Sequence, residues 1–411
     1  FDPPELVPYS RISTDILECK AHREHALKMA RQSIVLLKNE GNLLPLDKEK
    51  VKKIAIVGPN AANESVMLGN YFGIPSEICS VLEGVRQKLD GSGAEIVYEP
   101  GCCYVDNRVF QSAWSSTSFS LDGNPGWQAE YFANPTLAGK PVVVRMEEKI
   151  QFQHGDGEEA APGVSAHQMS IRYQADFVPA QSGDITFYLS GDDGYRLYVD
   201  GQLKLDSRQN ECYYTLDAEE GRTYRLMIEY WQYADICELT FDVGHSWLSE
   251  AHQVADRVKD ADVILFVGGL SASLEGESMN VPYEGFKGGD RLDIALPRVQ
   301  TNLLKALYET GKPVVFVLLT GSAVAMEWEA GHIPAILNAW YPGQAGGQAV
   351  ADVLFGDYNP AGRLPVTFYK KTEDLPDFED YGMDNRTYRY FRGEPRYPFG
   401  YGLSYTSFVY D

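Results

Sequence analysis

The 411-residue sequence predicts an α/β fold with a mostly parallel sheet that an all-β insertion interrupts. Two observations support this prediction. Short apolar runs alternate with helical patterns in the first and last parts of the chain, which is typical of β, α, β units. Between residues 120 and 246 the pattern changes to apolar/polar alternation separated by turn residues, which is typical of antiparallel strands.

The first α/β part is expected over residues 23–119, after a linker at residues 1–22 that leads from a preceding domain. A helix is predicted over residues 24–41, "EHALKMARQSIVLLKNEG", because its apolar residues form a broad face and Gly41 stands where a C′ cap belongs. A buried strand follows at residues 54–57. "SVLEGVRQKL" then predicts a helix, and "AEIVYEPG" predicts a second strand.

The insertion is expected over residues 120–246 and predicts a β-sandwich or barrel. Its runs "DITFYLSGDDGYRLYVDGQLKLD" and "RTYRLMIEYWQYADICELTFDV" alternate on a period of two. Asp192 and Asp193 lie at a turn, and adjacent carboxylates suit calcium. Asp-Gly is also ordinary hairpin sequence, so turn formation without a metal is the alternative interpretation.

The second α/β part is expected over residues 247–394. The strands "ADVILFVGG", "KPVVFVLLTG" and "IPAILNAW" alternate with the helices "PRVQTNLLKALYETG" and "QAGGQAVADVLFG". Residues 395–411 form an aromatic, glycine-rich tail whose rings need a surface to pack on. We expect that surface to belong to a following domain.

Composition excludes several classes of partner and cofactor. The formal net charge of −22 would repel nucleic acids and anionic membranes. No apolar run is long enough to span a bilayer, and none of the glycine loops has the spacing of a phosphate-binding loop. The six cysteines form no CxxC pair. The sequence therefore predicts no cofactor, no nucleic-acid partner and no membrane span.

An acidic loop, "SLEGESMNVPYEGFKGGDR", follows the buried strand "ADVILFVGG" and carries Glu275, Glu277, Glu284, Asp290 and Arg291. Open α/β sheets bind ligands at the carboxyl ends of their strands. A general acid needs burial or a neighbouring carboxylate to raise its pKa, and "EGE" offers a candidate with such a neighbour. The alternative is a solvated loop in which Asp290 and Arg291 form an ion pair.

Several strings resemble the second, α/β-sandwich domain of family 3 glycoside hydrolases, the β-glucosidases and β-xylosidases. They are "ARQSIVLLKNEGNLLPL", "IAIVGPNA", "GGDRLDIALP", "WYPGQAGGQAVADVLFGDYNPAGRLPVTF" and "YPFGYGLSYTSF". The insertion, from "GWQAEYFANPTLAGKP" to "YWQYADICELTFDV", resembles a PA14 domain, a β-sandwich. The resemblance implies a three-layer α/β sandwich interrupted by a PA14-like sandwich, which in related enzymes overhangs the active-site pocket.

The resemblance also implies retaining hydrolysis by two carboxyl groups. In the family the nucleophile is an Asp of a preceding (β/α)8 barrel, in a Ser-Asp-Trp-like context that this sequence lacks. The acid/base is a Glu of the α/β-sandwich, and its motif maps onto Glu277, with Glu275 second and Glu284 third. Asp290 and Arg291 are then expected to shape the loop.

The expected function is that of a fragment of an exo-acting β-glucosidase or β-xylosidase, periplasmic or secreted, which removes terminal β-linked sugars from oligosaccharides or glycosides. Without the barrel and its nucleophile, the chain alone is expected to be inactive. The alternative is a non-catalytic carbohydrate-binding module with calcium-dependent PA14 lectin activity through Asp192 and Asp193.

Overall fold

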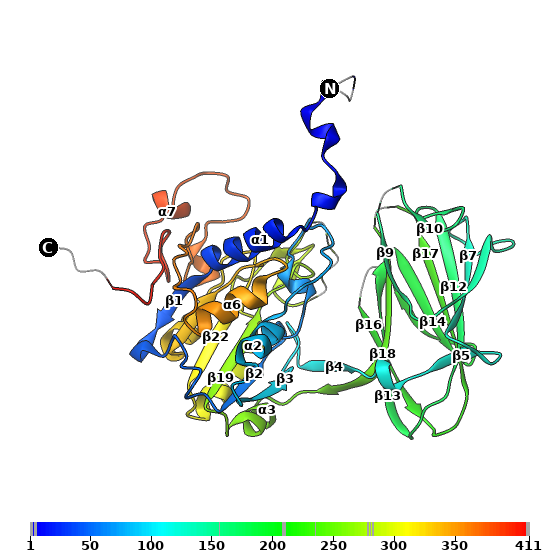
Figure 1. Cartoon of the computed structure of the whole chain (residues 1–411), viewed down its shortest axis with the longest axis horizontal. Coiled ribbons are helices and arrows are strands. Elements are labelled where there is room, and N and C mark those ends of the chain that lie inside the picture. The colour runs from blue at the N-terminus through cyan, green and yellow to red at the C-terminus, as the bar shows by residue number, and fades with distance from the viewer. Residues whose placement is uncertain are drawn as a thin grey trace. The chain divides into compact units, whose positions relative to one another are not determined.

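The computed structural model divides into two compact units. The α/β unit comprises the chain up to Arg108 and from Ser249 onward, and the β-rich unit comprises Val109–Leu248 (Figure 1). The structure describes residues 3, 6–155, 157–207, 211–234, 236–277, 279, 281 and 283–407.

The α/β unit is built on one six-stranded sheet. In spatial order its strands are β1 (Val35–Asn39), β23 (Ala335–Asn338), β22 (Val314–Leu319), β19 (Val263–Gly269), β2 (Lys53–Val57) and β3 (Glu95–Glu99). All neighbours pair in parallel except β1, which pairs antiparallel with β23. The predicted mostly parallel sheet is confirmed.

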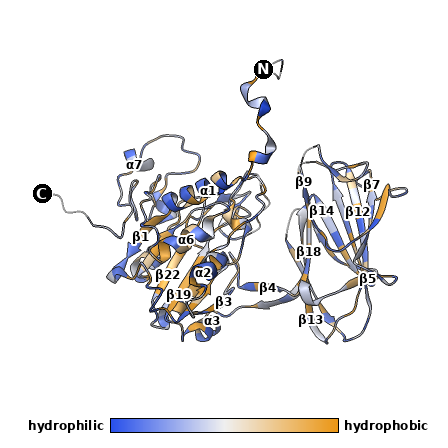
Figure 2. Ribbon diagram, viewed as in Figure 1, coloured by the Kyte–Doolittle hydropathy of each residue, from blue (hydrophilic) through white to orange (hydrophobic). Residues whose placement is uncertain are grey.

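Helices cover both faces of this sheet and give three layers. The helices are α1 (Lys20–Ser33), α2 (Val81–Leu89), α3 (Ala251–Val258), α4 (Arg298–Glu309), α5 (Glu327–His332), α6 (Gly346–Leu354) and the short α7 (Thr387–Tyr390). The core on one face joins α1, α2 and α6 to alternate strand residues, and the core on the other face joins α3 and α4 to the intervening ones (Figure 1). The strands between these layers are the most apolar segments of the unit (Figure 2).

The predicted helix over residues 24–41 is wrong in its second half. The helix α1 ends at Ser33, and the residues that follow form strand β1. Residues 34–37 are all buried, which requires apolar neighbours on both sides of the chain. A surface helix buries only one side, whereas a strand inside a covered sheet buries both, so the apolar run indicates a strand.

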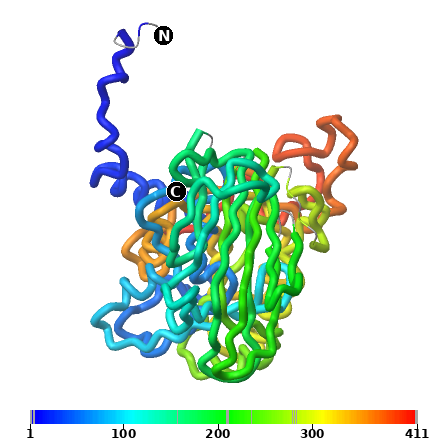
Figure 3. Tube along the Cα trace, turned by 90° about the vertical axis from the view of Figure 1, so that its right-hand side faces the viewer, coloured from blue at the N-terminus to red at the C-terminus, as the bar shows by residue number. Residues whose placement is uncertain are grey.

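The β-rich unit consists of two large antiparallel sheets around one core, with a further two-stranded sheet of β10 (Glu159–Ala161) and β11 (Val164–Ser165). The first contains β15 (Gln202–Ser207), β14 (Gly194–Val199), β17 (Tyr224–Gln232), β12 (Met169–Phe177), β5 (Phe119–Leu121), β6 (Asn124–Pro125), β7 (Trp127–Phe132) and β8 (Val143–Glu147). The second contains β16 (Cys212–Ala218), β13 (Gly183–Asp192), β18 (Cys237–Leu248), β4 (Arg108–Ser112) and β9 (Gln151–His154). Figure 3 shows the long strands side by side. The predicted all-β sandwich insertion is confirmed.

The β-rich unit begins at Val109, before the expected start at residue 120, and ends at Leu248, close to the expected end at 246. The earlier start has a clear cause, because β4 pairs with β18 at the edge of the second sheet. The sequence of β4, "RVFQS", is too short to reveal an alternating pattern by itself.

The described part of the aromatic tail packs on its own unit. Leu403 bridges to Leu36 of β1, and the Tyr401 hydroxyl donates to the backbone carbonyl of Leu37 at 3.1 Å. The Tyr405 hydroxyl donates to the carbonyl of Val353 in α6 at 2.7 Å. The tail therefore covers the β1 side of the sheet.

Candidate active site

The order of the strands defines a ligand-binding edge. From β3 to β23 the parallel strands follow the chain order 2-1-3-4-5, so the direction of winding reverses between β2 and β19. The reversal places α4, the helix that follows β19, on the opposite face from α2, and it separates the loops after β2 and β19. Such a switch point is where open α/β sheets bind ligands. The acidic loop follows β19 at this point.

Glu275 is held in a cage of donors. Its Oε1 accepts from the backbone N–H of Gly321 at 2.6 Å and from the Tyr341 hydroxyl at 2.8 Å, and its Oε2 accepts from the Ser322 hydroxyl at 2.5 Å. These donors come from the loops after β22 and β23, so the carboxylate joins three loops. The three hydrogen bonds engage both carboxyl oxygens and hold the side chain in one orientation.

Tyr341 remains a donor in this cage. Burial raises the pKa of the Tyr341 hydroxyl, and the negative charge of Glu275 raises it further. The close approach of the neighbouring loops depends on glycine: a Cβ at Gly321 would lie 2.9 Å from the Tyr341 ring. The ring therefore packs against a backbone that has no side chain at this position.

Arg291 connects the acidic loop to the loop after β22 by hydrogen bonds. Its guanidinium donates to the carbonyl of Ala295 at 2.8 Å, to the carbonyl of Asp293 at 3.1 Å and to the Ser322 hydroxyl at 3.3 Å. Burial lowers the pKa of Arg291, and the charge of Glu275 opposes this shift. Asp290 is exposed on β21 (Asp290–Arg291), a two-residue strand that pairs with β20 (Phe286–Lys287). Among the ion pairs of the described residues, Arg291 has none with Asp290.

Glu277 differs from Glu275 in that its side chain faces solvent. Its carboxylate accepts a hydrogen bond from the hydroxyl of Tyr71, which lies in the loop after β2. The two residues thus meet from the two strands that flank the switch point. Glu277 is thus an exposed carboxylate at this edge of the sheet, held by a hydrogen bond from Tyr71.

Glu284 lies apart from this cluster. Its side chain is 91% exposed, and its carboxylate lies 3.5 Å from the guanidinium of Arg298 at the start of α4. A pair so exposed contributes little to stability. This arrangement is that of a solvated surface carboxylate.

The Asp192 and Asp193 pair lies in the β-rich unit. The Oδ2 of Asp193 accepts from the backbone N–H of Tyr233 at 2.5 Å, and the carbonyl of Asp192 accepts from the Tyr230 hydroxyl. Asp193 therefore stabilises the turn between β17 and β18. In the described part of the chain, no three His, Cys, Asp or Glu residues form a group that could hold a metal ion.

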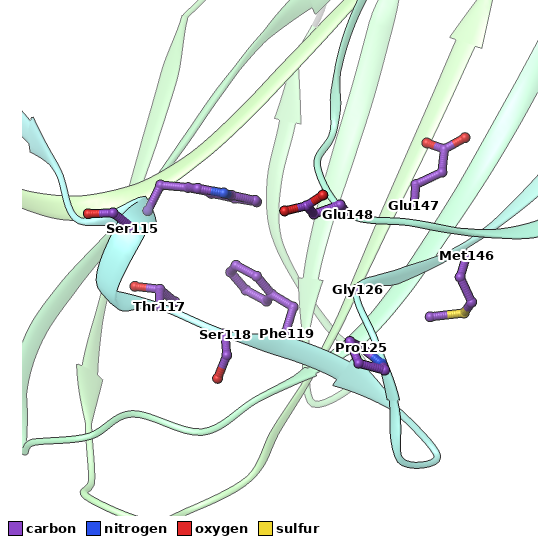
Figure 4. A pocket seen from close by; sticks show the side chains of 10 residues that line it. Ser115, Thr117, Ser118, Phe119, Pro125, Gly126, Met146, Glu147 and Glu148 are labelled. Atoms are coloured by element: carbon purple, nitrogen blue, oxygen red, sulfur yellow. The ribbon is translucent and has the colours of Figure 1, made fainter.

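A pocket in the β-rich unit does not contain any of the residues of the acidic loop. Phe119 and Glu148 line it, and the side chain of Glu147 points away from them (Figure 4). The ring of Trp114 already contacts Phe119, at 5.2 Å between ring centroids, and has the Lys149 Nζ 5.8 Å from its centroid. The pocket thus offers a partly engaged aromatic ring and one carboxylate, whereas the sheet edge offers an exposed carboxylate at a switch point.

The sequence did not lead us to Tyr71, Asn70 and Tyr341 as part of the site. "GNYFG" places an aromatic pair between glycines in the loop after the first parallel strand, and "WYPG" follows the last one. Aromatic residues beside glycines at the carboxyl ends of parallel strands are the signal that could have indicated them.

Fold and site together define an α/β protein that presents an exposed carboxylate at the switch point of its sheet, an arrangement suited to acid–base chemistry. The model of the glycosyl hydrolase family 3 C-terminal domain matches residues 34–405, and the chain belongs to this family.

Curated relatives extend this assignment. The chain is 40% identical to a xylan 1,4-β-xylosidase of Xylanibacter ruminicola over 99% of its own length and 47% of that protein. It is 32% identical to a β-glucosidase of Rhizobium radiobacter over 93% of its length and 48% of that protein. The crystal structure of a β-glucosidase from Kluyveromyces marxianus in complex with glucose matches 95% of the chain and 49% of that structure, with a TM-score of 0.75 and 25% identity.

The chain therefore spans about half the length of the curated relatives that it matches. No helix in the described part of the chain is both long and apolar enough to cross a membrane.

Proposed function

We propose that this chain supplies the general acid/base of a retaining, exo-acting β-glycosidase that removes terminal β-linked glucose or xylose from oligosaccharides. Glu277 is the acid/base in this proposal. The nucleophile is an aspartate of an N-terminal barrel that pairs with this domain, so the chain alone is inactive. The relatives support the class, since both a β-xylosidase and a β-glucosidase match nearly the whole chain.

One observation carries the choice of Glu277. A general acid must bring its proton to the leaving oxygen, so its carboxyl group needs an open approach. Glu275 is engaged by three donors, and Glu284 lies away from the switch point. Glu277 is exposed at that point, beside the loop after β2. In retaining hydrolysis it would protonate the leaving oxygen and then deprotonate the attacking water.

The β-rich unit, in the same proposal, is a PA14-like domain that shapes access to the substrate. A lectin role for this unit has less support, because the Asp193 carboxylate already accepts from backbone N–H groups. Calorimetry of the chain with sugars, with and without calcium, tests this alternative: tight binding that depends on calcium would favour it. A periplasmic or secreted location belongs to the proposal and is tested by fractionation of the source cells.

The test of Glu277 uses the full-length enzyme. Glu277→Ala should slow substrates with poor leaving groups by roughly 10²- to 10⁴-fold and activated aryl glycosides far less, because activated leaving groups need no proton. Azide should restore turnover of the activated substrates by attacking the glycosyl-enzyme. Glu284→Ala is the matched control and should match the parent. Equal losses on both substrate types would contradict the assignment, as would strong hydrolysis by the present chain alone.

A further inference from the structure

Three consecutive residues of the loop after β2 contact the neighbouring loops, and two of them donate hydrogen bonds to the acidic loop. A Cβ on Gly69 would lie 3.1 Å from the Tyr341 ring, so the chain runs close against that ring. The Asn70 Nδ2 donates to the carbonyl of Glu275 at 3.0 Å. The Tyr71 hydroxyl donates to the Oε2 of Glu277. We call residues 69–71 the clasp segment.

The backbone of the clasp segment is adapted to these contacts. Gly69 has φ +74° and Tyr71 has φ +54°, both in the left-handed region. Glycine adopts this region readily, but a tyrosine there is strained. Packing does not compensate the strain, because the Tyr71 side chain is 87% exposed. The gain that this conformation brings is the hydrogen bond between the Tyr71 hydroxyl and Glu277.

The charges around Glu277 leave this hydrogen bond as its main polar interaction. Tyr71 faces it from the loop after β2, and Glu275 lies two positions earlier in its own loop. Glu275 directs its carboxylate to Gly321, Ser322 and Tyr341, with Arg291 beyond them. Within the described residues, Glu277 takes part in no ion pair. The hydrogen bond to Glu277 also raises the pKa of Tyr71, which keeps the hydroxyl protonated as a donor.

We propose that Tyr71 is a positioning residue for the acid/base Glu277. This inference rests on the proposed function. By donating to Oε2, Tyr71 fixes the carboxyl group and leaves Oε1 as the oxygen that carries the transferred proton. Held in this way, Oε1 delivers its proton to the leaving oxygen in the first step. In the second step the same oxygen takes the proton of the attacking water, and the Tyr71 proton stays in place throughout.

The first experiment needs no activity. Carboxyl-labelled glutamate is introduced into the present chain, and the Glu277 carboxyl signal is compared by NMR at one fixed pH in the parent, Tyr71→Phe and Tyr308→Phe. Tyr71→Phe should change the chemical shift of this signal, because the hydroxyl that donates to Oε2 is lost. Tyr308, half-exposed near the end of α4, is the control, and its variant should give the Glu277 signal of the parent. An unchanged Glu277 signal in Tyr71→Phe overturns the proposal.

The second experiment measures kinetics of the full-length enzyme. Tyr71→Phe should lower kcat for poor leaving groups roughly tenfold and leave activated aryl glycosides nearly unchanged. Kinetics identical to those of Tyr308→Phe would overturn the role. Failure of the proposed function can be distinguished from failure of the Tyr71 role. The first would appear as equal losses on both substrate types in Glu277→Ala, where Tyr71 is intact.

Discussion

Replacing Glu275 by alanine should destabilise the α/β unit, whereas the same change at Glu277 or Glu284 should not. The three carboxylates lie on one loop, within ten positions of sequence, and differ in their surroundings. Glu275 accepts from three donors that belong to two other loops. Glu284 is 91% exposed beside Arg298. The comparison therefore separates a structural carboxylate from a solvent-facing one.

The expected cost follows from the donors that lose their acceptor. A hydrogen bond to a charged group contributes about 1.5–3 kcal/mol. The N–H of Gly321 is exposed and regains water, so it contributes little to the loss. The hydroxyls of Ser322 and Tyr341 are half-buried, and each loses most of its contribution. We expect Glu275→Ala to cost about 2–4 kcal/mol, and Glu275→Gln, which keeps one acceptor oxygen, about half of that.

The assay must report on the α/β unit alone, because a chain with two units need not unfold in one step. Hydrogen exchange of the β19 and β22 amides in increasing urea gives that measure. Glu277→Ala and Glu284→Ala should leave the free energy of unfolding within experimental error of the parent. The reasoning is refuted if Glu275→Ala costs no more than Glu284→Ala, or if Glu277→Ala costs as much as Glu275→Ala.

Three further predictions concern stability elsewhere. Burial raises the pKa of Glu329, which is 2% exposed. The contribution of the protonated side chain to stability is therefore present at pH 4 and lost as the pH rises through the raised folded-state pKa. Glu329→Gln should raise the thermal midpoint at pH 8 and leave it unchanged at pH 4. A Cβ on Gly347 would lie 1.9 Å from the carbonyl oxygen of Ser80, so Gly347→Ala should cost about 2 kcal/mol or more in urea unfolding. The control is Gly331 in α5, where a Cβ would meet open space, and Gly331→Ala should stabilise by about 0.5–1 kcal/mol. Phe241→Ala should cost the β-rich unit about 3–5 kcal/mol, because the ring is fully buried in the core of that unit. Exchange of the β22 amides, which belong to the α/β unit, should be unchanged.

Much of the fold was predictable because its signals are local. The runs that became β2, β19 and β22 are apolar throughout, and strands of a covered parallel sheet have this composition. The alternation in β12 and β17 is equally local. The error at residues 34–37 arose because a short apolar run fits a helix face as well as a buried strand. Pairing of β1 with β23, some 300 positions away, decides between them.

The site, like the fold, has features that local sequence predicts and features that it does not. The position of the acidic loop followed from one buried strand and the rule that ligands bind at its carboxyl end. The choice between Glu275 and Glu277 did not follow from the residues alone, because "EGE" gives both the same neighbours in sequence. The two glutamates differ in their hydrogen-bond donors. Glu275 accepts from Gly321, Ser322 and Tyr341. Glu277 accepts from Tyr71.

The anchoring of Glu275 also restrains the backbone of the acidic loop near Glu277. Glu275 and Glu277 are two positions apart in a bend, so the cage around the first restrains the backbone that carries the second. An acid/base group must be exposed to reach its substrate, yet an exposed side chain is free to rotate. Anchoring a neighbouring carboxylate in the protein and adding one donor from Tyr71 limits that freedom without covering Glu277. Under the proposed function, loss of the Glu275 cage should therefore reduce kcat more than it raises KM.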